Sequence, residues 1–397
     1  MRRSMKGAVL VSAVAMLSLG TQAAVAAPTS PGKVTIKHVI LDWTPARTPA
    51  QTQALRGASE SGTTVKTFTT TVTDGSSTFT YTMMGKNPFV TQAKPSKTIQ
   101  TTLIPVIIKF SNGDKWNPTA VTSCDTESAI TRVQNSPLFN AQAWSFGATS
   151  VGTGEYVDEF QRAEFWSQTK PTGINPGYNT NLAITTHAAL TINVPSADSA
   201  TIDSAGCGND LLGGVDIDYL DSRLQSYITG TLGPTASTTF PLFVLTNVVA
   251  YEDSDPSDCC VLGYHSSLTN DSHFQVYGIA DYDTSGDFGA KVSDTSAMSH
   301  EVAEAINDPN GSNPTKPWGD VGQVPSGQCQ SNLEVGDPLS GTAALISDTL
   351  NGFTYHLQEL AFFSWFYHSS PSLGVNGWYS DEDTFTTSAA ACPPGGP

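Results

Sequence analysis

The sequence predicts an α+β protein that is rich in β-strands. Threonine, serine, glycine and asparagine are abundant, and only 14% of the 397 residues are charged, a composition typical of β-rich exported proteins. Segments of strand-like alternation are mixed with segments of helical periodicity. The two kinds do not alternate regularly, as repeated strand–helix–strand units would, so α+β is the expected class.

The first residues are typical of a secretory signal peptide. Three cations precede an apolar run, residues 7–20, which is too short to span a bilayer. Small residues just before Pro28 suit cleavage by signal peptidase. We therefore expect residues 1–27 to be removed and the mature protein to be secreted, either to the extracellular space or to a periplasm.

We expect the mature chain to contain two regions. Residues 28–235 form a β-rich N-terminal region with two helices, and residues 236–397 form a zincin-like C-terminal region. A stretch rich in Gly, Pro, Ser and Thr, residues 230–239, is the weakest point between them. The sequence leaves open whether the first region is a separate domain or completes one fold around the second.

The elements predicted in the N-terminal region are mostly strands. Residues 64–84 alternate threonine with apolar residues around Asp74-Gly75, which is a hairpin signal. Residues 97–110 are typical of a buried strand, in which Pro105 favours a sheet edge or a bulge. The other elements expected here are a strand over 33–43, helices over 125–143 and 154–169, and a β-like segment over 182–194.

The C-terminal region is predicted to combine apolar strands with helices. Its most informative helix covers residues 296–309, a segment of helix-forming residues that stops at Pro309, which cannot continue a helix. The other elements expected are a short amphipathic helix over 216–228, strands over 241–250 and 273–280, and an aromatic, packed helix over 359–368.

Residues 300–304, His-Glu-Val-Ala-Glu, form an imperfect zinc-protease signature. In His-Glu-x-x-His helices two ligands lie one turn apart, and the Glu deprotonates the water on the metal. Here Glu304 replaces the second His, and a carboxylate can also bind zinc. On a helix His300, Glu304 and Asp308 share one face, with Glu301 beside them. A solvated surface helix is one alternative, but the apolar neighbours predict a half-buried helix. A structural hydrogen-bond cluster is the alternative to a metal site on such a helix.

A zinc site needs at least three protein ligands, and two other segments offer the third. Glu334 or Asp337, in the segment Glu-Val-Gly-Asp, follows the helix closely, although a Gly-Asp-Pro sequence is also an ordinary turn. His265 is a candidate to replace the missing imidazole. A lone histidine is nevertheless more often a satisfied polar residue than a ligand.

Residues 281–287 resemble a calcium-binding loop. They place Asp281, Asp283 and Asp287 at its first, third and seventh positions, with a glycine at the sixth. Val292 stands where such a loop has its bidentate Glu. A turn rich in Asp and Gly is therefore the preferred interpretation, and calcium is the weaker one.

Six cysteines in an exported chain predict three disulfides and not a thiolate zinc site. Cys259 and Cys260 are adjacent, so we expect each of them to pair with a different, distant partner. The remaining cysteines are Cys124, Cys207, Cys329 and Cys392.

The formal net charge of −17 disfavours nucleic acid and anionic membranes as partners. Removal of the basic signal segment makes the mature chain more negative still. No later stretch is long and apolar enough to predict a transmembrane helix. We expect an extracellular peptide or polymer as the partner, and the oligomeric state is left open.

The segment from Val244 to Asp337 resembles the secreted phosphate-induced, EXORDIUM-like proteins of plants and their bacterial relatives. The resemblance implies a secreted protein with a zincin-like helix and a site formed by His300, Glu301, Glu304 and Glu334, with His265 as a further member. These proteins are better known as extracellular growth-related proteins than as enzymes. The matching pieces, in chain order, are Val244-Leu245-Thr246, Cys260, Gly263-Tyr264-His265, Ser299 to Glu304, Pro309, Trp318 and Glu334 to Asp337.

The preferred functional hypothesis is a secreted zinc metallopeptidase-like hydrolase. Zn²⁺ would be held by His300, Glu304 and either Glu334 or His265, with Glu301 as the base. One alternative is a non-catalytic extracellular binding or structural protein. A second alternative is a carbohydrate-active or carbohydrate-binding protein, in which C-terminal aromatics line a subsite, although core packing is the commoner use of such residues. These aromatics are Phe362, Phe363, Trp365, Phe366, Tyr367, Trp378 and Tyr379.

Overall fold

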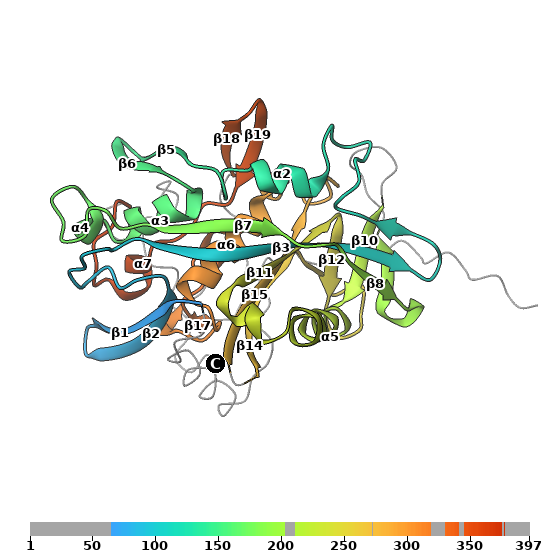
Figure 1. Ribbon diagram of the computed structural model, residues 1–397, viewed down its shortest axis with the longest axis horizontal. Helices are drawn as coiled ribbons and strands as arrows, with labels where there is room; N and C mark the ends of the chain where they lie inside the picture. The colour runs from blue at the N-terminus through green and yellow to red at the C-terminus, as the bar shows by residue number, and fades with distance from the viewer. Residues whose placement is uncertain are drawn as a thin grey trace, which may run out of the picture. The chain divides into compact units, whose positions relative to one another are not determined.

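The computed structural model describes residues 65–202, 211–271, 273–318, 330–340, 345–374 and 377. These residues belong to one compact unit, Lys33–Pro397. Strands and helices are mixed along it and strands predominate, which confirms the predicted α+β, β-rich class (Figure 1). The predicted signal segment and the strand over 33–43 lie outside the described residues. Within the described part, no helix is long and apolar enough to cross a membrane.

The largest sheet combines strands from both halves of the chain. Its strands are β3 (Lys97–Phe110), β4 (Lys115–Trp116), β7 (Thr180–Thr186), β8 (Leu190–Val194), β11 (Phe240–Thr246), β14 (Gly263–Asn270) and β15 (His273–Tyr282). The long strand β3 pairs in parallel with β11 on one side, and with β7 and then β8 on the other. Next to β11 lies the parallel strand β15, and β14 pairs antiparallel with β15.

Pro105 lies inside this sheet, so of the two positions expected for it, an edge or a bulge, the edge is wrong. On one side its register partner is Val244. On the other side, the pairing of β3 with β7 ends at Leu103 and its pairing with β8 begins at Val106. Because proline has no N–H to donate to a ladder, it is tolerated at this gap between two successive partner strands.

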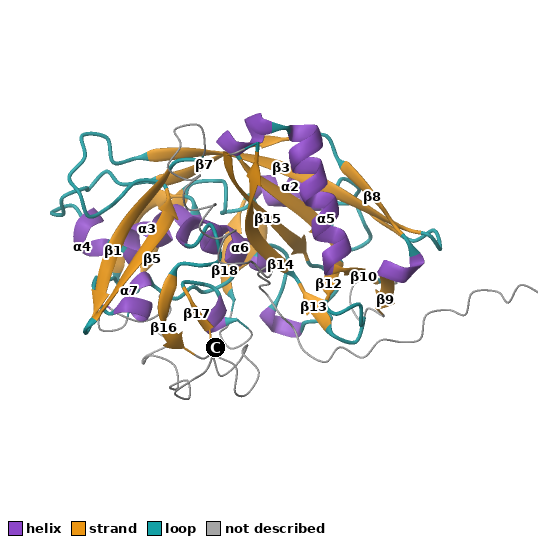
Figure 2. Cartoon of the chain, turned by 90° about the horizontal axis from the view of Figure 1, so that it is seen from below, coloured by secondary structure: helices purple, strands orange, loops and turns teal. Residues whose placement is uncertain are grey.

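Two helices pack on opposite faces of the sheet, α5 (Ile217–Tyr227) and α6 (Ser296–Asn307). Successive residues of a strand point to opposite faces. Accordingly, Leu242 of β11 belongs to the same core cluster as the apolar residues of α6, whereas Phe243 belongs to that of α5. In Figure 2, β14 and β15 lie between the two helices.

The remaining described strands form a second sheet and four two-stranded ladders. The second sheet has the order β13-β12-β10-β9, and the ladder β1-β2 confirms the hairpin predicted around Gly75, whose φ is +61°. The bounds are β1 (Thr67–Asp74), β2 (Ser77–Met84), β5 (Gln142–Phe146), β6 (Thr149–Gly154), β9 (Ser199–Ile202), β10 (Leu212–Asp216), β12 (Val248–Tyr251), β13 (Cys259–Val261), β16 (Pro314–Trp318), β17 (Gln330–Asn332), β18 (Ile346–Leu350) and β19 (Phe353–Leu357).

Two of the predicted helices are shorter than expected. The helix predicted over 125–143 is α2, Ala129–Asn135, which ends before Pro137, because the residue before a proline disfavours the helical conformation. The helix predicted over 359–368 is only α7, Phe363–Tyr367. The other helical segments are α3 (Tyr156–Glu164), α4 (Trp166–Thr169), η1 (Ser196–Asp198), η2 (Ile228–Leu232), η3 (Pro234–Thr238), η4 (Gly289–Lys291) and η5 (Asp337–Leu339).

The C-terminal aromatic segment packs into the core. Phe362, Phe363, Trp365, Phe366 and Tyr367 are buried, as core packing predicts. Phe362 stacks on Phe160 of α3, with ring centroids 5.4 Å apart. Trp378 and Tyr379 lie outside the described residues.

The pairing expected for the adjacent cysteines is wrong, because Cys259 and Cys260 form a disulfide with each other. A trans peptide holds neighbouring Cα atoms about 3.8 Å apart. The peptide between these two residues is cis, and their Cα atoms lie 3.0 Å apart. Cys124 is also in a disulfide. Cys207, Cys329 and Cys392 lie outside the described residues.

Candidate metal centre

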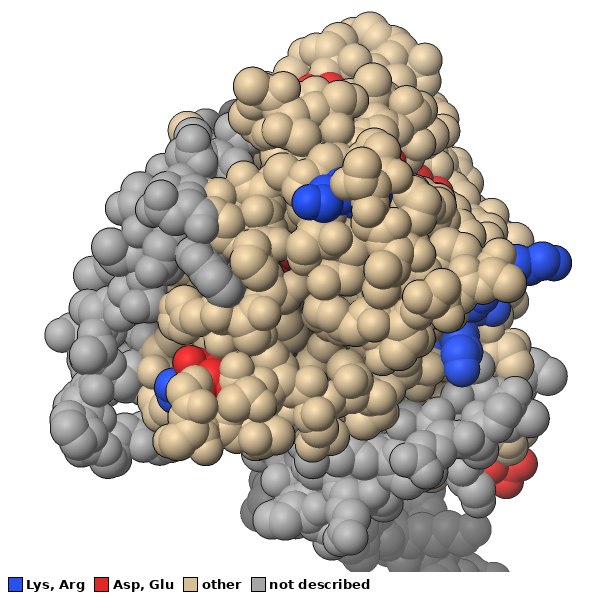
Figure 3. Space-filling view, turned by 90° about the vertical axis from the view of Figure 1, so that its left-hand side faces the viewer, with Lys and Arg blue, Asp and Glu red and all other residues tan. Residues whose placement is uncertain are grey.

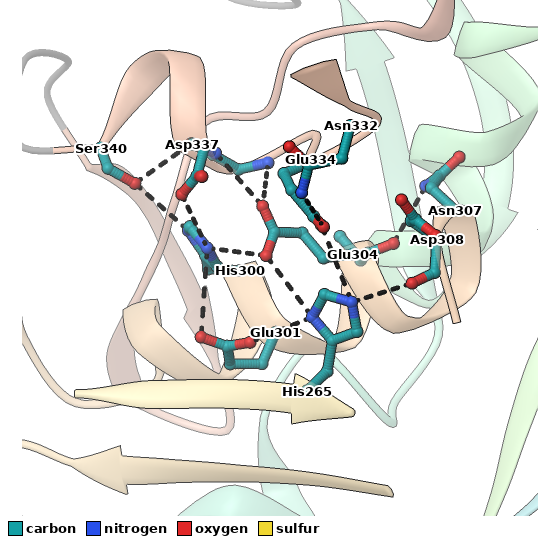
Figure 4. Close-up of polar contacts among 12 residues, drawn as sticks. His265, His300, Glu301, Glu304, Asn307, Asp308, Asn332, Glu334, Asp337 and Ser340 are labelled. Atoms are coloured by element: carbon teal, nitrogen blue, oxygen red, sulfur yellow. Dashed lines mark hydrogen bonds and ion pairs between the residues drawn. The ribbon is translucent and has the colours of Figure 1, made fainter. Parts of the chain in front are cut away.

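Segments far apart in the sequence bring the predicted site residues together around α6 (Figure 4). α6 supplies three of them, β14 supplies one, and the loop after β17 supplies the last. Every residue of α6 is buried, so the helix is more enclosed than the predicted half-buried helix. The five predicted residues, all 0% exposed, are His265, His300, Glu301, Glu304 and Glu334.

Several of the chain's acidic side chains lie in its interior and not on its surface. The face shown in Figure 3 carries few charged side chains. By contrast, the carboxyl groups of the centre are fully buried. Burying a charge is costly unless it is paired, binds a cation or is neutralised by a proton, so each of these acids needs either a cation or a proton.

The tautomer of His300 is fixed by the partners of its Nδ1 atom. Nδ1 lies 3.1 Å from Oε1 of Gln358 and 3.3 Å from the Ser340 hydroxyl. The Gln358 amide is itself oriented, because its Nε2 donates to the carbonyl of Gly336 at 2.6 Å. An amide oxygen only accepts, so Nδ1 of His300 carries the hydrogen. In the neutral ring Nε2 is then left with a lone pair.

That lone pair faces two carboxylates. Nε2 of His300 lies 2.9 Å from Oε2 of Glu304 and 3.6 Å from Oδ1 of Asp337. Among the described residues, neither Nε2 of His300 nor Oε2 of Glu304 has a hydrogen bond of acceptable geometry. Atoms that both offer lone pairs repel each other unless a cation lies between them.

Glu304 is held in place by backbone donors. Its Oε1 accepts from the N–H groups of Gly336 at 2.9 Å and Asp337 at 3.2 Å. Burial raises the pKa of the Glu304 carboxyl well above its usual range, although these two N–H groups oppose the shift. The second oxygen, Oε2, remains directed at the histidines.

His265 has the opposite tautomer for the same kind of reason. Its Nε2 lies 2.9 Å from the backbone carbonyl of Asp308, which only accepts, so Nε2 carries the hydrogen. The neutral ring then directs the Nδ1 lone pair at Oε2 of Glu301, 3.5 Å away, and Oε2 of Glu304, 3.7 Å away.

Glu301 lies between the two imidazoles. Its Oε1 is 4.0 Å from Nε2 of His300, and its Oε2 faces Nδ1 of His265.

Two glycines pack closely against the site. A Cβ atom on Gly263 would lie 2.7 Å from Cγ of Glu301, and one on Gly336 would lie 2.3 Å from Nδ1 of His300. The glycines of the Gly-Tyr-His and Glu-Val-Gly-Asp segments are thus required by the close packing of the site.

The described residues contain two groups of three that could hold a metal ion, and both include Glu304. One is His300, Glu304 and Asp337, and the other is His265, Glu301 and Glu304. With metal–ligand bonds of about 2.0–2.1 Å, a tetrahedral site separates its ligand atoms by about 3.3–3.4 Å. The histidine nitrogens lie 2.9 to 3.7 Å from the carboxylate oxygens of their own groups, and these distances are close to that value.

Glu334 and Asp308 lie outside both of these groups. Oε2 of Glu334 lies 3.7 Å from Nε2 of His265, the nitrogen that carries the hydrogen, and Oε1 accepts from Asn332. Asp308 does not share the face of His300 and Glu304, so that expectation is wrong. The helix ends at Asn307, and the Asp308 carboxylate accepts from the backbone of the following turn. Burial raises the pKa of Asp308 to about 7.

No protein-family model, curated protein or solved structure matches this chain. The resemblance to EXORDIUM-like proteins therefore stays a prediction.

Two side-chain oxygens of the calcium-like segment accept hydrogen bonds. Oδ1 of Asp281, a residue of β15, accepts from the N–H of Val248. Oδ1 of Asp283 accepts from the Ser285 hydroxyl. Burial raises the pKa of Asp281 well above its usual range and that of Asp283 to about 6. In the described residues, neither belongs to a group of three donors close enough to hold a metal.

Sequence reasoning missed Gln358 and Ser340, which orient His300. Neither residue lies in a motif, and Gln358 is 58 positions from His300. Gly263 and Gly336, in contrast, lie in the two segments whose motifs predicted the site.

Proposed function

We propose that this protein is a secreted, metal-dependent hydrolase whose centre is His300, Glu304 and Asp337. The observation that carries the proposal is the Nε2 lone pair of His300, which faces carboxylate oxygens at 2.9 and 3.6 Å in a buried site. The donor set of one imidazole and two carboxylates suits Zn²⁺. Asp337 is the third metal ligand in this proposal, whereas the hypothesis from the sequence had Glu334 or His265 as that ligand.

The residues around the centre have separable roles. When bound, a divalent cation supplies Lewis acidity and lowers the pKa of a water that it holds. Gln358 and Ser340 fix the orientation of His300, as outer partners of metal ligands commonly do. Glu301 follows His300 directly in α6 and lies beside the centre, so it is positioned to accept a proton and pass it to a leaving group.

Peptide bonds are the proposed substrate class, because the His-Glu-x-x-Glu helix is most similar to the helix of zinc proteases. Secretion is supported by the signal-like residues 1–27. Carboxylate ligands donate more negative charge than imidazole, which makes the bound cation a weaker Lewis acid. We therefore expect slower hydrolysis than in enzymes with two histidine ligands on this helix.

One observation favours a rival function. All donors of the centre are 0% exposed, as is common for a structural metal site in a non-catalytic protein. The substitution Glu301→Gln separates the two functions. In the hydrolase it keeps the fold and the metal held by His300, Glu304 and Asp337, but abolishes zinc-dependent cleavage of labelled casein and of a fluorogenic peptide library. If the wild-type protein binds zinc and cleaves neither substrate, the structural function is correct and hydrolysis is refuted.

A further inference from the structure

A second histidine–carboxylate group overlaps the proposed hydrolytic centre and adds His265, which that centre does not use. It consists of His265, Glu301 and Glu304, all buried, with one ligand atom from each lying within 4.8 Å of the others. It shares Glu304 with the first group and includes Glu301, the proposed base.

The orientation of His265 points to a ligand at this place. Its Nε2–H donates to the carbonyl of Asp308 where α6 ends, so the ring cannot turn its other nitrogen away without losing that bond. Nδ1 therefore faces two carboxylates with a lone pair. Oε2 of Glu304, fully buried and directed into the same space, has no hydrogen bond of acceptable geometry among the described residues.

The distances from Nδ1 of His265 to the two carboxylate oxygens favour a metal ion over a proton as the cation between them. An N–H···O hydrogen bond spans about 2.7–3.2 Å between its heavy atoms. Nδ1 of His265 lies 3.5 Å from Oε2 of Glu301 and 3.7 Å from Oε2 of Glu304, which is too long for a proton to bridge. A cation with bonds of about 2.0–2.2 Å to each atom fits this spacing.

We propose that His265, Glu301 and Glu304 form a second divalent-cation site that inhibits the enzyme when it is filled. A cation held there by Oε2 of Glu301 occupies the carboxylate that must otherwise accept a proton. The inhibitory role rests on the proposed function, whereas the second binding site does not. Hydrolysis then rises as the first cation binds and falls as the second one binds.

The ligand chemistry favours zinc and similar ions. One imidazole and two carboxylates are a nitrogen–oxygen donor set that suits Zn²⁺, and the two negative charges balance its charge. Because Glu304 serves both groups, occupation of the first site reduces the charge available to the second. The second cation therefore binds more weakly than the first.

The test is a calorimetric titration of chelator-treated, full-length mature protein with Zn²⁺, for the wild type, His265→Gln and His187→Ala. The amide nitrogen of glutamine can replace Nε2 of His265 as donor to Asp308, while the Nδ1 lone pair is lost. His187 is an exposed histidine and serves as the matched control. We expect two equivalents of zinc to bind to the wild type and to His187→Ala, and one to His265→Gln.

Casein cleavage across the same zinc series gives the second readout. It should rise and then fall for the wild type, and rise without falling for His265→Gln. A wild type that binds one equivalent or none, or a His265→Gln variant that still binds two, overturns the second site. Activity that keeps rising with the second equivalent overturns its inhibitory role. If no protein cleaves casein, the proposed function fails, and the stoichiometry still decides the second site.

Should His265→Gln not fold, as judged by circular dichroism, His265→Asn replaces it. Asparagine carries an amide group near the position of Nδ1 and has nothing at the position of Nε2. A folded His265→Asn protein that binds two equivalents of zinc with wild-type affinity equally overturns the proposal.

Discussion

Replacement of Gly336 by alanine tests how closely the centre is packed. Gly336 has φ −84° and ψ −36°, a conformation open to any residue, so alanine causes no backbone strain. The added Cβ would instead lie 2.3 Å from Nδ1 and 2.6 Å from Cε1 of His300. Since unstrained contacts between such atoms are about 3.5 Å, the ring must move by about 1 Å.

This movement disturbs both ends of the imidazole. The Nδ1 contact with Gln358 and the Nε2 approach to Glu304 depend on the present ring position. Overpacking of this kind costs about 1–3 kcal/mol of folding free energy. We also expect the affinity for zinc to fall at least about tenfold, as it does when the orientation of a ligand is lost.

Urea unfolding and zinc titration of Gly336→Ala measure the two effects. Gly230→Ala is the matched control, because a Cβ there has nothing within 4 Å. The control should retain the zinc affinity of the wild type. If Gly336→Ala unfolds at the same urea concentration as the wild type and binds zinc equally tightly, the close contact between Gly336 and His300 does not exist.

Three further predictions concern other parts of the molecule. Burial raises the pKa of Glu155 from 4.5 to about 8, so the stability given by its neutral form is complete below pH 4.5 and is lost as the pH rises through 8. Glu155→Gln should exceed the wild type in unfolding free energy by about 2–5 kcal/mol at pH 8.5 and match it at pH 4, and equal stabilities at both pH values would contradict this. Phe160→Ala removes a fully buried ring that stacks on Phe362, and should cost about 3–5 kcal/mol in urea unfolding; a cost below about 1 kcal/mol would refute the packing. Gln358→Met removes the acceptor for Nδ1–H of His300 and should weaken zinc binding about 10–100-fold while circular dichroism stays unchanged; unaltered affinity would show that Gln358 does not orient the ring.

The elements that could be predicted from the sequence are those with strong local signals. The hairpin around Gly75 and the helix before Pro309 follow from turn chemistry and from the inability of proline to continue a helix. The i,i+4 spacing of His300 and Glu304 likewise brought these two side chains together. Long-range pairing is not encoded locally, so the central position of Pro105 could not be foreseen.

Within the site, the sequence indicated the segments but not their contacts. Glu334 and Asp337 are the two ends of one four-residue segment in the loop after β17. Which of them contacts His300 therefore depends on the path of that loop. Asp308 was misplaced because an ideal helix was extended one residue too far. The role of Gln358 arises only when β19 is placed against α6, which no local pattern reveals.

The zinc content of the wild type compared with that of Glu304→Gln tests the central claim most directly. In the variant Oε1 still accepts from the N–H groups of Gly336 and Asp337, and the new amide can donate to Nε2 of His300. The fold is thus retained while the oxygen shared by both groups is lost. After zinc loading and gel filtration, elemental analysis should find at least one equivalent of zinc in the wild type and none in folded Glu304→Gln. Equal zinc contents in the two proteins would contradict the account.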